Sequence, residues 1–166
     1  MFNSRFLREG VLALIGWLAC SAAYAGDLVR PDPSIAPAEV VAIQLMGLKN
    51  NDLIETDFGI LQTWSFAHPK NRSVTGPFPR FAQMLKGPDY FVLLNHKSHE
   101  IQKSPEAPEG MTGSGTTRKQ FDVLIETANG DILYFSWVVQ KVALGQFKDC
   151  WMTVSVSAPR PVGQSG

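Results

Sequence analysis

"FDVLIETANGDILYFSWVV", residues 121–139, is the stretch that decides the fold. Two runs rich in β-branched and aromatic residues, which favour strands, flank the dipeptide Asn129-Gly130. Asn-Gly between two such runs is the preferred sequence for a two-residue hairpin turn of type I′. A turn of that length pairs Ile125 with Tyr134, because the turn fixes the register of the strands. We therefore expect an antiparallel hairpin at the centre of a β-sheet.

The predicted register divides the side chains of this hairpin between two faces, since side chains alternate along a strand. The face assigned to the core carries Phe121, Val123, Ile125 and Thr127 with Ile132, Tyr134, Ser136 and Val138. The opposite face carries the carboxylates Asp122 and Glu126 beside the apolar residues Leu124, Leu133, Phe135 and Trp137. An apolar patch left in water usually marks a contact surface, so these four apolar residues are predicted to form a homodimer surface.

Three amphipathic segments precede the hairpin. The first is predicted to begin at Pro37, and Val41, Leu45 and Leu48 follow at the spacing of one helix face. The second is predicted to begin near Asp57, a favourable N-cap, and to stop before Pro69, because a proline disfavours helix in the residue before it. The third is predicted to span residues 77–87, which leaves "NRSVTG", residues 71–76, as a turn between two helices.

Two further stretches have the alternating pattern of strands, residues 97–103 and "CWMTVSVS", residues 150–157. The second places Cys150 on an apolar side, where a free thiol acts as a small hydrophobe. Residues 104–117, rich in Gly, Pro, Ser and Thr, are predicted to be a mobile connection. Helices followed by antiparallel strands predict an α+β fold, with about three N-terminal helices packed on a curved, cone-like sheet of about four strands.

The N-terminal residues are typical of a secretory signal peptide. Arg5 and Arg8 precede the apolar run "VLALIGWLAC", and "AYA" supplies a cleavage site after Ala25. Export to the periplasm or the exterior is therefore predicted. A short membrane anchor is one alternative, although the apolar run falls short of the roughly 20 residues that a span requires. Acylation of Cys20, as in a lipoprotein, is another.

Four segments follow from these patterns: a signal peptide at 1–25, an extended lead-in at 26–36, a single α+β domain at 37–157 and a disordered tail at 158–166. Fifteen basic and fifteen acidic residues cancel, so no long-range field attracts nucleic acid, and no nucleic-acid partner is predicted. His68, His96 and His99 lack the regular spacing of metal ligands, so no metal or cofactor is predicted. A metal pair formed by His96 and His99 is the alternative.

One long motif carries a family resemblance. The run "WSFAHPKNRSVTGPFPRFAQML", residues 64–85, together with "YFVLLNH", residues 90–96, and "CWMT", residues 150–153, resembles the domain of unknown function family 4864 of bacteria and plants. The resemblance covers residues 37–156. His68 stands where that family is expected to have a small residue, and the Gly/Ser-rich loop is longer. The family has no assigned activity, so the resemblance implies no catalytic residue.

The order of the elements is also similar to the cone-shaped, cystatin-like fold of nuclear transport factor two and ketosteroid isomerase. That fold closes three helices against a bent antiparallel sheet and leaves a pocket between them. Because such folds serve enzymes, ligand binders and dimerisation modules alike, the resemblance implies architecture rather than activity.

The residues around the predicted turn at 71–76 are candidates for a ligand site. Backbone N–H groups at the start of the following helix, with Asn71 and Thr75, would receive an anion that Arg72 and Arg80 clamp. In the alternative interpretation, Arg72 pairs with a nearby carboxylate such as Asp57 or Asp52. Asn71 and Thr75 then cap helix ends.

Aromatic residues of the helical segments form a second group of candidates. They either line a pocket for an apolar ligand or pack as an ordinary core, and they are Trp64, Phe66, Phe78, Phe81 and Tyr90. Trp64 is the one that joins Asn71, Arg72, Thr75 and Arg80 as a predicted ligand-binding residue.

The function predicted from these observations is a ligand- or partner-binding module. The alternative is a small cone-fold enzyme, such as an isomerase, dehydratase or hydrolase, acting on a small organic molecule. That alternative requires an acid or histidine with a shifted pKa inside a pocket, and the candidates are Asp52, Asp57, His68 and His96. The sequence has no GxSxG, HExxH or glycine-rich phosphate motif that would name a reaction.

Overall fold

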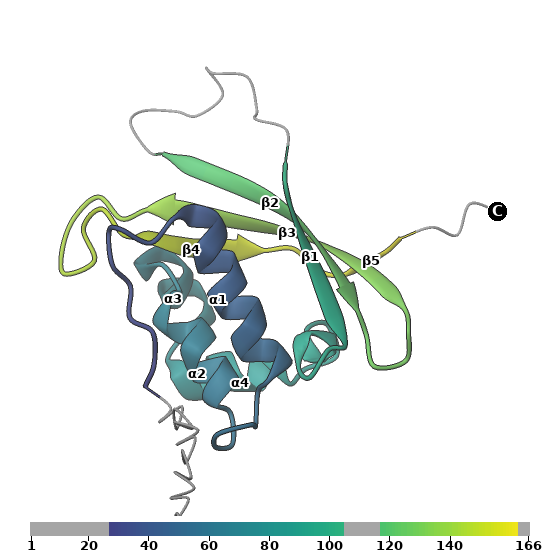
Figure 1. Cartoon of the computed structure of the whole chain (residues 1–166). Coiled ribbons are helices and arrows are strands. Elements are labelled where there is room, and N and C mark those ends of the chain that lie inside the picture. The colour runs from purple at the N-terminus through teal and green to yellow at the C-terminus, as the bar shows by residue number, and fades with distance from the viewer. Residues whose placement is uncertain (1–26, 105–116, 163–166) are drawn as a thin grey trace, which may run out of the picture.

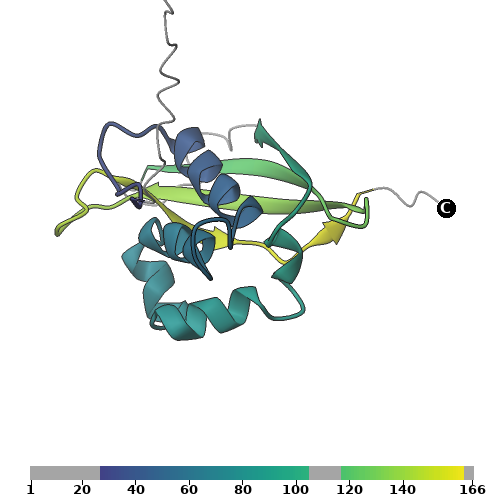
Figure 2. The same cartoon turned by 60° about the horizontal axis from the view of Figure 1, so that its bottom comes forward.

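Four α-helices precede the sheet in the computed structural model, which describes residues 27–104 and 117–162. The helices are α1 (Pro37–Lys49), α2 (Phe58–Ser65), α3 (Pro69–Thr75) and α4 (Phe78–Leu85), followed by the short 3₁₀ helix η1 (Phe91–Leu93). The strands are β1 (Ser98–Lys103), β2 (Arg118–Glu126), β3 (Ile132–Lys141), β4 (Trp151–Val156) and β5 (Arg160–Pro161). Figures 1 and 2 show the helices together on one side of the sheet. The predicted α+β fold, with N-terminal helices packed on a curved antiparallel sheet, is confirmed.

The sheet is antiparallel in the order β1-β2-β3-β4, and β5 pairs with β3. α1 lies against β1, β3 and β4. α3 packs on β4. Apolar residues of α1, α2 and α4 meet those of the central strands in one main core; its fully buried members include Leu45, Ile60, Phe66 and Phe135. The helices and the sheet are therefore two layers around one interior.

The first helix begins where the sequence predicted it, with Pro37 at its first position. Proline is tolerated there because the first N–H groups of a helix have no partner inside the helix. The predicted turn between the second and third helices is wrong: α2 already ends at Ser65, and Pro69 opens α3. The Nδ1 atom of His68 accepts the backbone N–H of Lys70 and so caps α3 at its start.

The hairpin turn is longer by one residue than predicted. The N–H of Gly130 donates to the carbonyl of Thr127 at 3.0 Å, and Gly130 has a φ of 90°, a left-handed conformation that favours glycine. The N–H of Thr127 in turn donates to the carbonyl of Asp131 at 2.9 Å. The loop is therefore Ala128-Asn129-Gly130, a three-residue connection rather than a two-residue type I′ turn.

That extra residue moves every side chain of β3 to the other face of the sheet. Ile125 pairs with Leu133, and Tyr134 pairs with Leu124, so Ile125 and Tyr134 lie on opposite faces. Phe135 and Trp137 are 0% and 1% exposed and belong to the core.

The homodimer surface predicted from Leu124, Leu133, Phe135 and Trp137 is consequently wrong as defined. Leu133, Phe135 and Trp137 face the helices, and only Leu124 is on the outer face. The outer face is more polar than predicted: the hydroxyl of Tyr134 donates to Asp122 at 2.7 Å. Most of the apolar residues that suggested a dimer surface are therefore buried inside the molecule.

A bulge in β4 places its residues differently from simple alternation. Trp137 pairs with Val156 and Val139 pairs with Thr153, so β4 has one residue more than β3 between these pairs. The shift allows both Thr153 and Val156 to lie opposite core-facing residues. Cys150 is buried, as predicted, in a small second cluster made with Val142, Met152 and Phe147.

The ends of the described chain are both attached to the domain. The backbone of Val29, in the predicted lead-in, exchanges two hydrogen bonds with the side chain of Gln62 at 2.8 and 2.9 Å. The tail predicted to be disordered at 158–166 is wrong in part, because Arg160 and Pro161 form β5 beside Tyr134 and Leu133. The predicted signal peptide and nearly all of the predicted mobile connection lie outside the described residues. None of the helices in the described ranges has the length and apolarity to cross a bilayer.

Candidate functional site

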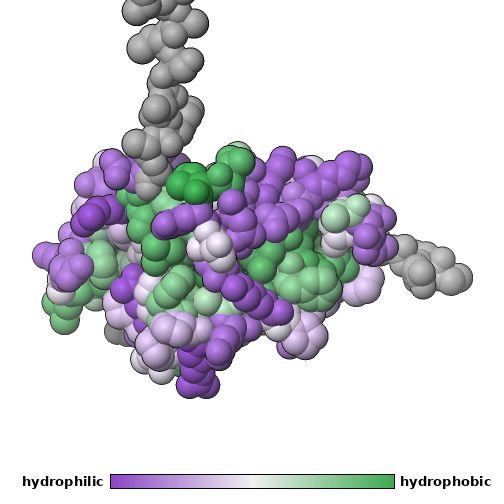
Figure 3. All heavy atoms as spheres, turned by 90° about the horizontal axis from the view of Figure 1, so that it is seen from below, coloured by the Kyte–Doolittle hydropathy of each residue, from purple (hydrophilic) through white to green (hydrophobic). Residues whose placement is uncertain are grey.

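A pocket of about 220 Å³ lies between the helices and the sheet. Its walls are mostly apolar and come from every layer, with Leu48, Ala67, Phe81, Leu85, Leu93 and Val156 among them. Val74, 75% exposed, and the exposed Ser155 also line it and so mark its mouth. Seen from the helical side, the surface carries hydrophobic residues in separate groups among hydrophilic ones (Figure 3). An apolar concave site with a few polar groups is the usual form of a small-molecule site.

Buried polar side chains form the floor of this pocket. The Oε1 atom of Gln44, on α1, accepts the indole N–H of Trp137 at 3.1 Å and the hydroxyl of Thr153 at 2.5 Å. The Nε2 atom of Gln44 donates to the carbonyl of Thr63, on α2, at 3.0 Å. These four residues are each at most 5% exposed, and all of them line the pocket. Burial of a polar group is costly unless it is hydrogen-bonded, so the network fixes Gln44 in one orientation.

Gln44 nevertheless has one hydrogen-bonding group to spare. A primary amide has two N–H donors, and the Oε1 atom already accepts two bonds. Within residues 27–104 and 117–162, only one bond is donated by Nε2, to Thr63. The hydroxyl of Thr63 donates to the carbonyl of Gly59 at 2.9 Å, which leaves its oxygen as an acceptor. Gln44 lines the pocket, so its floor includes an amide N–H that has no partner among the described residues.

Two of the predicted ligand-binding residues lie at the mouth. Asn71 and Thr75 both line the pocket, and the Thr75 hydroxyl donates to the Asn71 carbonyl at 3.0 Å. Tyr90 lines it from the other side, and its hydroxyl donates to the carbonyl of Val156 at 3.2 Å. Burial, with a smaller contribution from Asp89, raises the pKa of Tyr90, so its phenol stays protonated. The mouth is thus polar but uncharged.

Arg72 has a structural role instead of the predicted role of binding an anion. Its Nη2 atom donates to the carbonyls of Trp64 and Ser65 at 2.9 and 3.0 Å, which are the last carbonyls of α2. Its guanidinium also lies 4.8 Å from the ring centre of Trp64 and 5.5 Å from that of Phe147. Orphan carbonyls at a helix end require such donors. Arg72 therefore holds the end of α2 against α3, and its contacts are neither with Asp57 nor with Asp52.

Arg80 and Trp64 lie outside the pocket lining. Arg80 is exposed, and its stem packs over Gly76, where an added Cβ would lie 2.7 Å from the Arg80 Cδ. Trp64 packs on Phe81 with ring centres 5.1 Å apart. Of the five aromatic candidates, Phe81 and Tyr90 line the pocket, whereas Phe66 belongs to the core.

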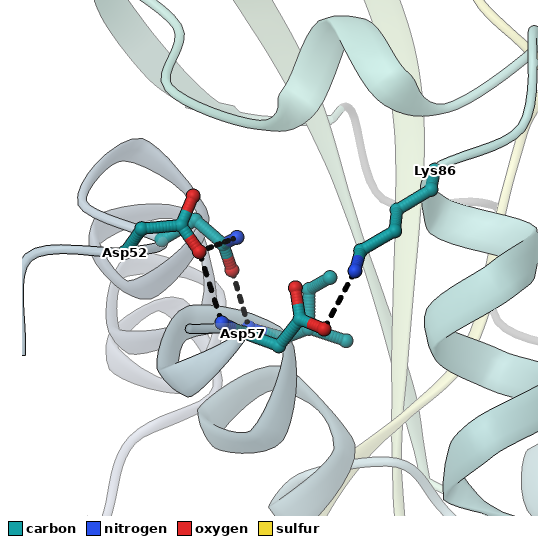
Figure 4. A network of polar contacts seen from close by, with 5 residues as sticks. Asp52, Asp57 and Lys86 are labelled. Carbon is teal, nitrogen blue, oxygen red and sulfur yellow. Dashed lines mark hydrogen bonds and ion pairs between the residues drawn. The ribbon is translucent and has the colours of Figure 1, made fainter. Parts of the chain in front are cut away.

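The carboxylates proposed for catalysis stabilise a loop. The Oδ1 atom of Asp52 accepts the backbone N–H of Asp57 and an N–H of Asn51, each at 2.9 Å (Figure 4). The side-chain oxygen of Asn51 accepts the N–H of Ile60 at 3.0 Å. Asn51 therefore caps α2, which is the role that was predicted for Asp57. Asp57 forms an ion pair with Lys86 at 2.6 Å. Backbone hydrogen bonding lowers the pKa of Asp52, as expected of an ionised structural carboxylate.

The histidines are also away from the pocket lining. His96 Nδ1 lies 2.8 Å from the carbonyl of Leu93, and its Nε2 lies 2.7 Å from Nδ1 of His99. Nδ1 of His96 is therefore the donor to Leu93, and its Nε2 accepts from His99. Burial lowers the pKa of both rings. No third His, Cys, Asp or Glu of the described residues joins them in a group suited to a metal.

Sequence reasoning missed the residues of the floor. Gln44 had a usable signal, because it is a polar residue within the apolar stripe of α1, next to Leu45. Thr153 and Trp137 had none, since the wrong register and the bulge hid their direction. Comparisons of the chain with protein-family models, curated proteins and solved structures found no match.

Proposed function

We propose that the protein is an exported module that binds a small, uncharged and mostly apolar molecule in the pocket between the helices and the sheet. The observation that carries this proposal is an apolar pocket of about 220 Å³ that ends on the buried amide of Gln44. The predicted leader at 1–25 supports a location in the periplasm or outside the cell.

The cost of keeping such a space supports a binding role. Unfilled core volume costs about 24 cal/mol per Å³, so this pocket forgoes up to about 5 kcal/mol of packing. Whole domains are stable by only about 5–15 kcal/mol. Larger side chains at Ala67 or Val154, which line the pocket, would remove that cost. The space is therefore more simply explained as a site than as a packing defect.

The resemblance to family 4864 and to the cone fold supports the same proposal, since that fold leaves a pocket at this place. The enzymatic alternative has less support. Its candidate acids and bases do not line the pocket; they are Asp52, Asp57, His68 and His96. Among the described residues that line the pocket, Tyr90 is the one titratable residue. The arrangement supports binding and orientation of a ligand rather than proton transfer to it.

The test is a titration of the mature protein, residues 26–166, labelled with 5-fluorotryptophan and followed by fluorine NMR. Benzene is the probe, because an apolar cavity of about 150 Å³ is known to bind it. Trp137 lines the pocket and Trp151 does not, which makes Trp151 an internal control. We expect a saturable shift of the Trp137 resonance alone. A folded protein whose Trp137 resonance shows no saturable change would refute the proposal.

A further inference from the structure

We propose that the ligand is a neutral molecule of about nine non-hydrogen atoms, with a carbonyl or hydroxyl oxygen that accepts the free N–H of Gln44. This inference rests on the proposed function and names the class of ligand for the same pocket. It depends on three properties of the site: its volume, its charge and the state of its floor.

The volume sets the size of the ligand. A cavity of about 150 Å³ accommodates benzene, which fills most of it. The pocket here, at about 220 Å³, is half as large again. By proportion it accepts about nine non-hydrogen atoms, which is the size of a single ring with a short substituent. Larger polycyclic molecules would protrude past Val74 at the mouth.

The lining sets the charge. The described lining residues include no Asp, Glu, His, Lys or Arg, and Tyr90 is neutral. Arg72, a candidate cation from the sequence, does not line the pocket and donates to the carbonyls of Trp64 and Ser65. An ion transferred into such surroundings loses its hydration without gaining a partner, which is strongly unfavourable. The ligand is therefore neutral at the pH at which it binds.

The hydrogen bonds of Gln44 on the floor determine which polar group the ligand carries. Gln44 Oε1 is occupied by Trp137 and Thr153, so the amide presents a donor and not an acceptor. A wholly apolar ligand would displace water from that N–H and leave it bare, which costs about 1–3 kcal/mol. An acceptor oxygen at the deep end of the ligand removes this cost. Specificity in the pocket thus comes from one hydrogen bond at its floor.

The experiment compares acetophenone, α-methylstyrene and benzoate by the same fluorine NMR titration. The first two have the same shape and differ in a C=O against a C=CH₂, and benzoate adds a charge at the same size. Because the two neutral probes differ in their affinity for water, the quantity of interest is how a variant changes their ratio of affinities. We expect Gln44→Met to lower the ratio of acetophenone to α-methylstyrene affinity by about tenfold.

Gln62→Met is the matched control. It makes the same substitution at a buried glutamine that does not line the pocket and bonds the backbone of Val29 instead, so its ratio should equal that of the unaltered protein. Infrared spectroscopy of carbonyl-labelled acetophenone bound to the unaltered protein is the second readout, because Gln44→Met also frees the hydroxyl of Thr153, and it decides the question if the variant does not fold. The bound carbonyl band is then expected at the frequency of a hydrogen-bonded ketone, and a band as in hydrocarbon solvent would overturn the inference.

The outcomes separate this inference from the proposed function. If both neutral probes bind, Gln44→Met leaves their ratio unchanged and the carbonyl band of acetophenone bound to the unaltered protein lies as in hydrocarbon solvent, the pocket binds ligands and the role of Gln44 is wrong. If benzoate binds more tightly than acetophenone, the pocket binds ligands, but the neutrality of the ligand, which the proposed function also states, is wrong. If no neutral probe perturbs Trp137, benzene included, the proposed function itself fails.

Discussion

Replacement of Gly59 by alanine is expected to destabilise the protein, although helix propensity alone predicts the opposite. Alanine is more favourable than glycine within a helix by about 1 kcal/mol. A Cβ at Gly59, however, would lie 2.0 Å from the carbonyl oxygen of Gly47 and 2.8 Å from Cα of Asn51. Those atoms are backbone, so α1 and α2 would have to move apart by more than an ångström to restore ordinary contact.

The magnitude follows from the contacts at this crossing. Overpacking against backbone costs about 3 kcal/mol, at the upper end of its usual range. Separation of the helices also weakens the bond from Ile60 to Asn51, which is worth about 1 kcal/mol. After subtraction of the propensity gain, the net loss is about 3 kcal/mol, or a fall in Tm of about 10 °C. The same movement would disturb the bond between Gln44 and Thr63, which crosses from α1 to α2.

The assay is thermal and urea unfolding of Gly59→Ala beside a matched variant, Gly47→Ala. A Cβ at Gly47 would lie 3.2 Å from the Gly59 carbonyl oxygen and 3.3 Å from the Gln62 side chain, a contact that a small shift relieves. The gain in propensity offsets that shift, so Gly47→Ala is expected to stay within about 1 kcal/mol of the unaltered protein. A Gly59→Ala protein as stable as Gly47→Ala would show that the two helices are not in close contact here.

Three further changes test other parts of the structure. Arg72→Ala is expected to lower the free energy of unfolding by about 2 kcal/mol, because it leaves the last carbonyls of α2 without charged donors; unchanged urea midpoints would contradict this. Burial lowers the pKa of His96 and His99 in the folded state, so the unfolded chain binds more protons and stability should fall as the pH drops below about 6.5; urea midpoints that are equal at about pH 7.5 and 5.5 would contradict it. Val74→Phe should narrow the mouth and weaken benzene binding several-fold, whereas Leu144→Phe, at an exposed residue that does not line the pocket, should not; equal affinities would place the entrance elsewhere.

The sequence by itself determined the class of the fold and the order of its elements, apart from α3 and β5. The apolar spacing after Pro37 and the alternation on both sides of Asn129-Gly130 are local signals, and each is read correctly as helix or strand. The burial of Cys150 was also predictable, because an alternating strand places it among apolar neighbours.

Prediction from local sequence failed where one short stretch of sequence is compatible with two local structures. Asn-Gly suits a two-residue turn and also a three-residue loop with glycine in the left-handed conformation, and one residue of difference exchanges the faces of β3. Pro69 suits the end of α2 as well as the first position of α3. In both places the packing of Phe135, Trp137 and the helices selects the structure that is observed.

Only the tertiary structure decided the candidate site. Gln44 meets Trp137 and Thr153 across 93 and 109 residues of chain, and no spacing in the sequence encodes such a meeting. Arg72 shows the reverse case, in which a residue with the chemistry of a ligand clamp is bound through its Nη2 atom to the end of its neighbouring helix. Hydrogen-bond partners are assigned by which elements pack together, because a buried polar group must bond to whatever the fold brings within reach.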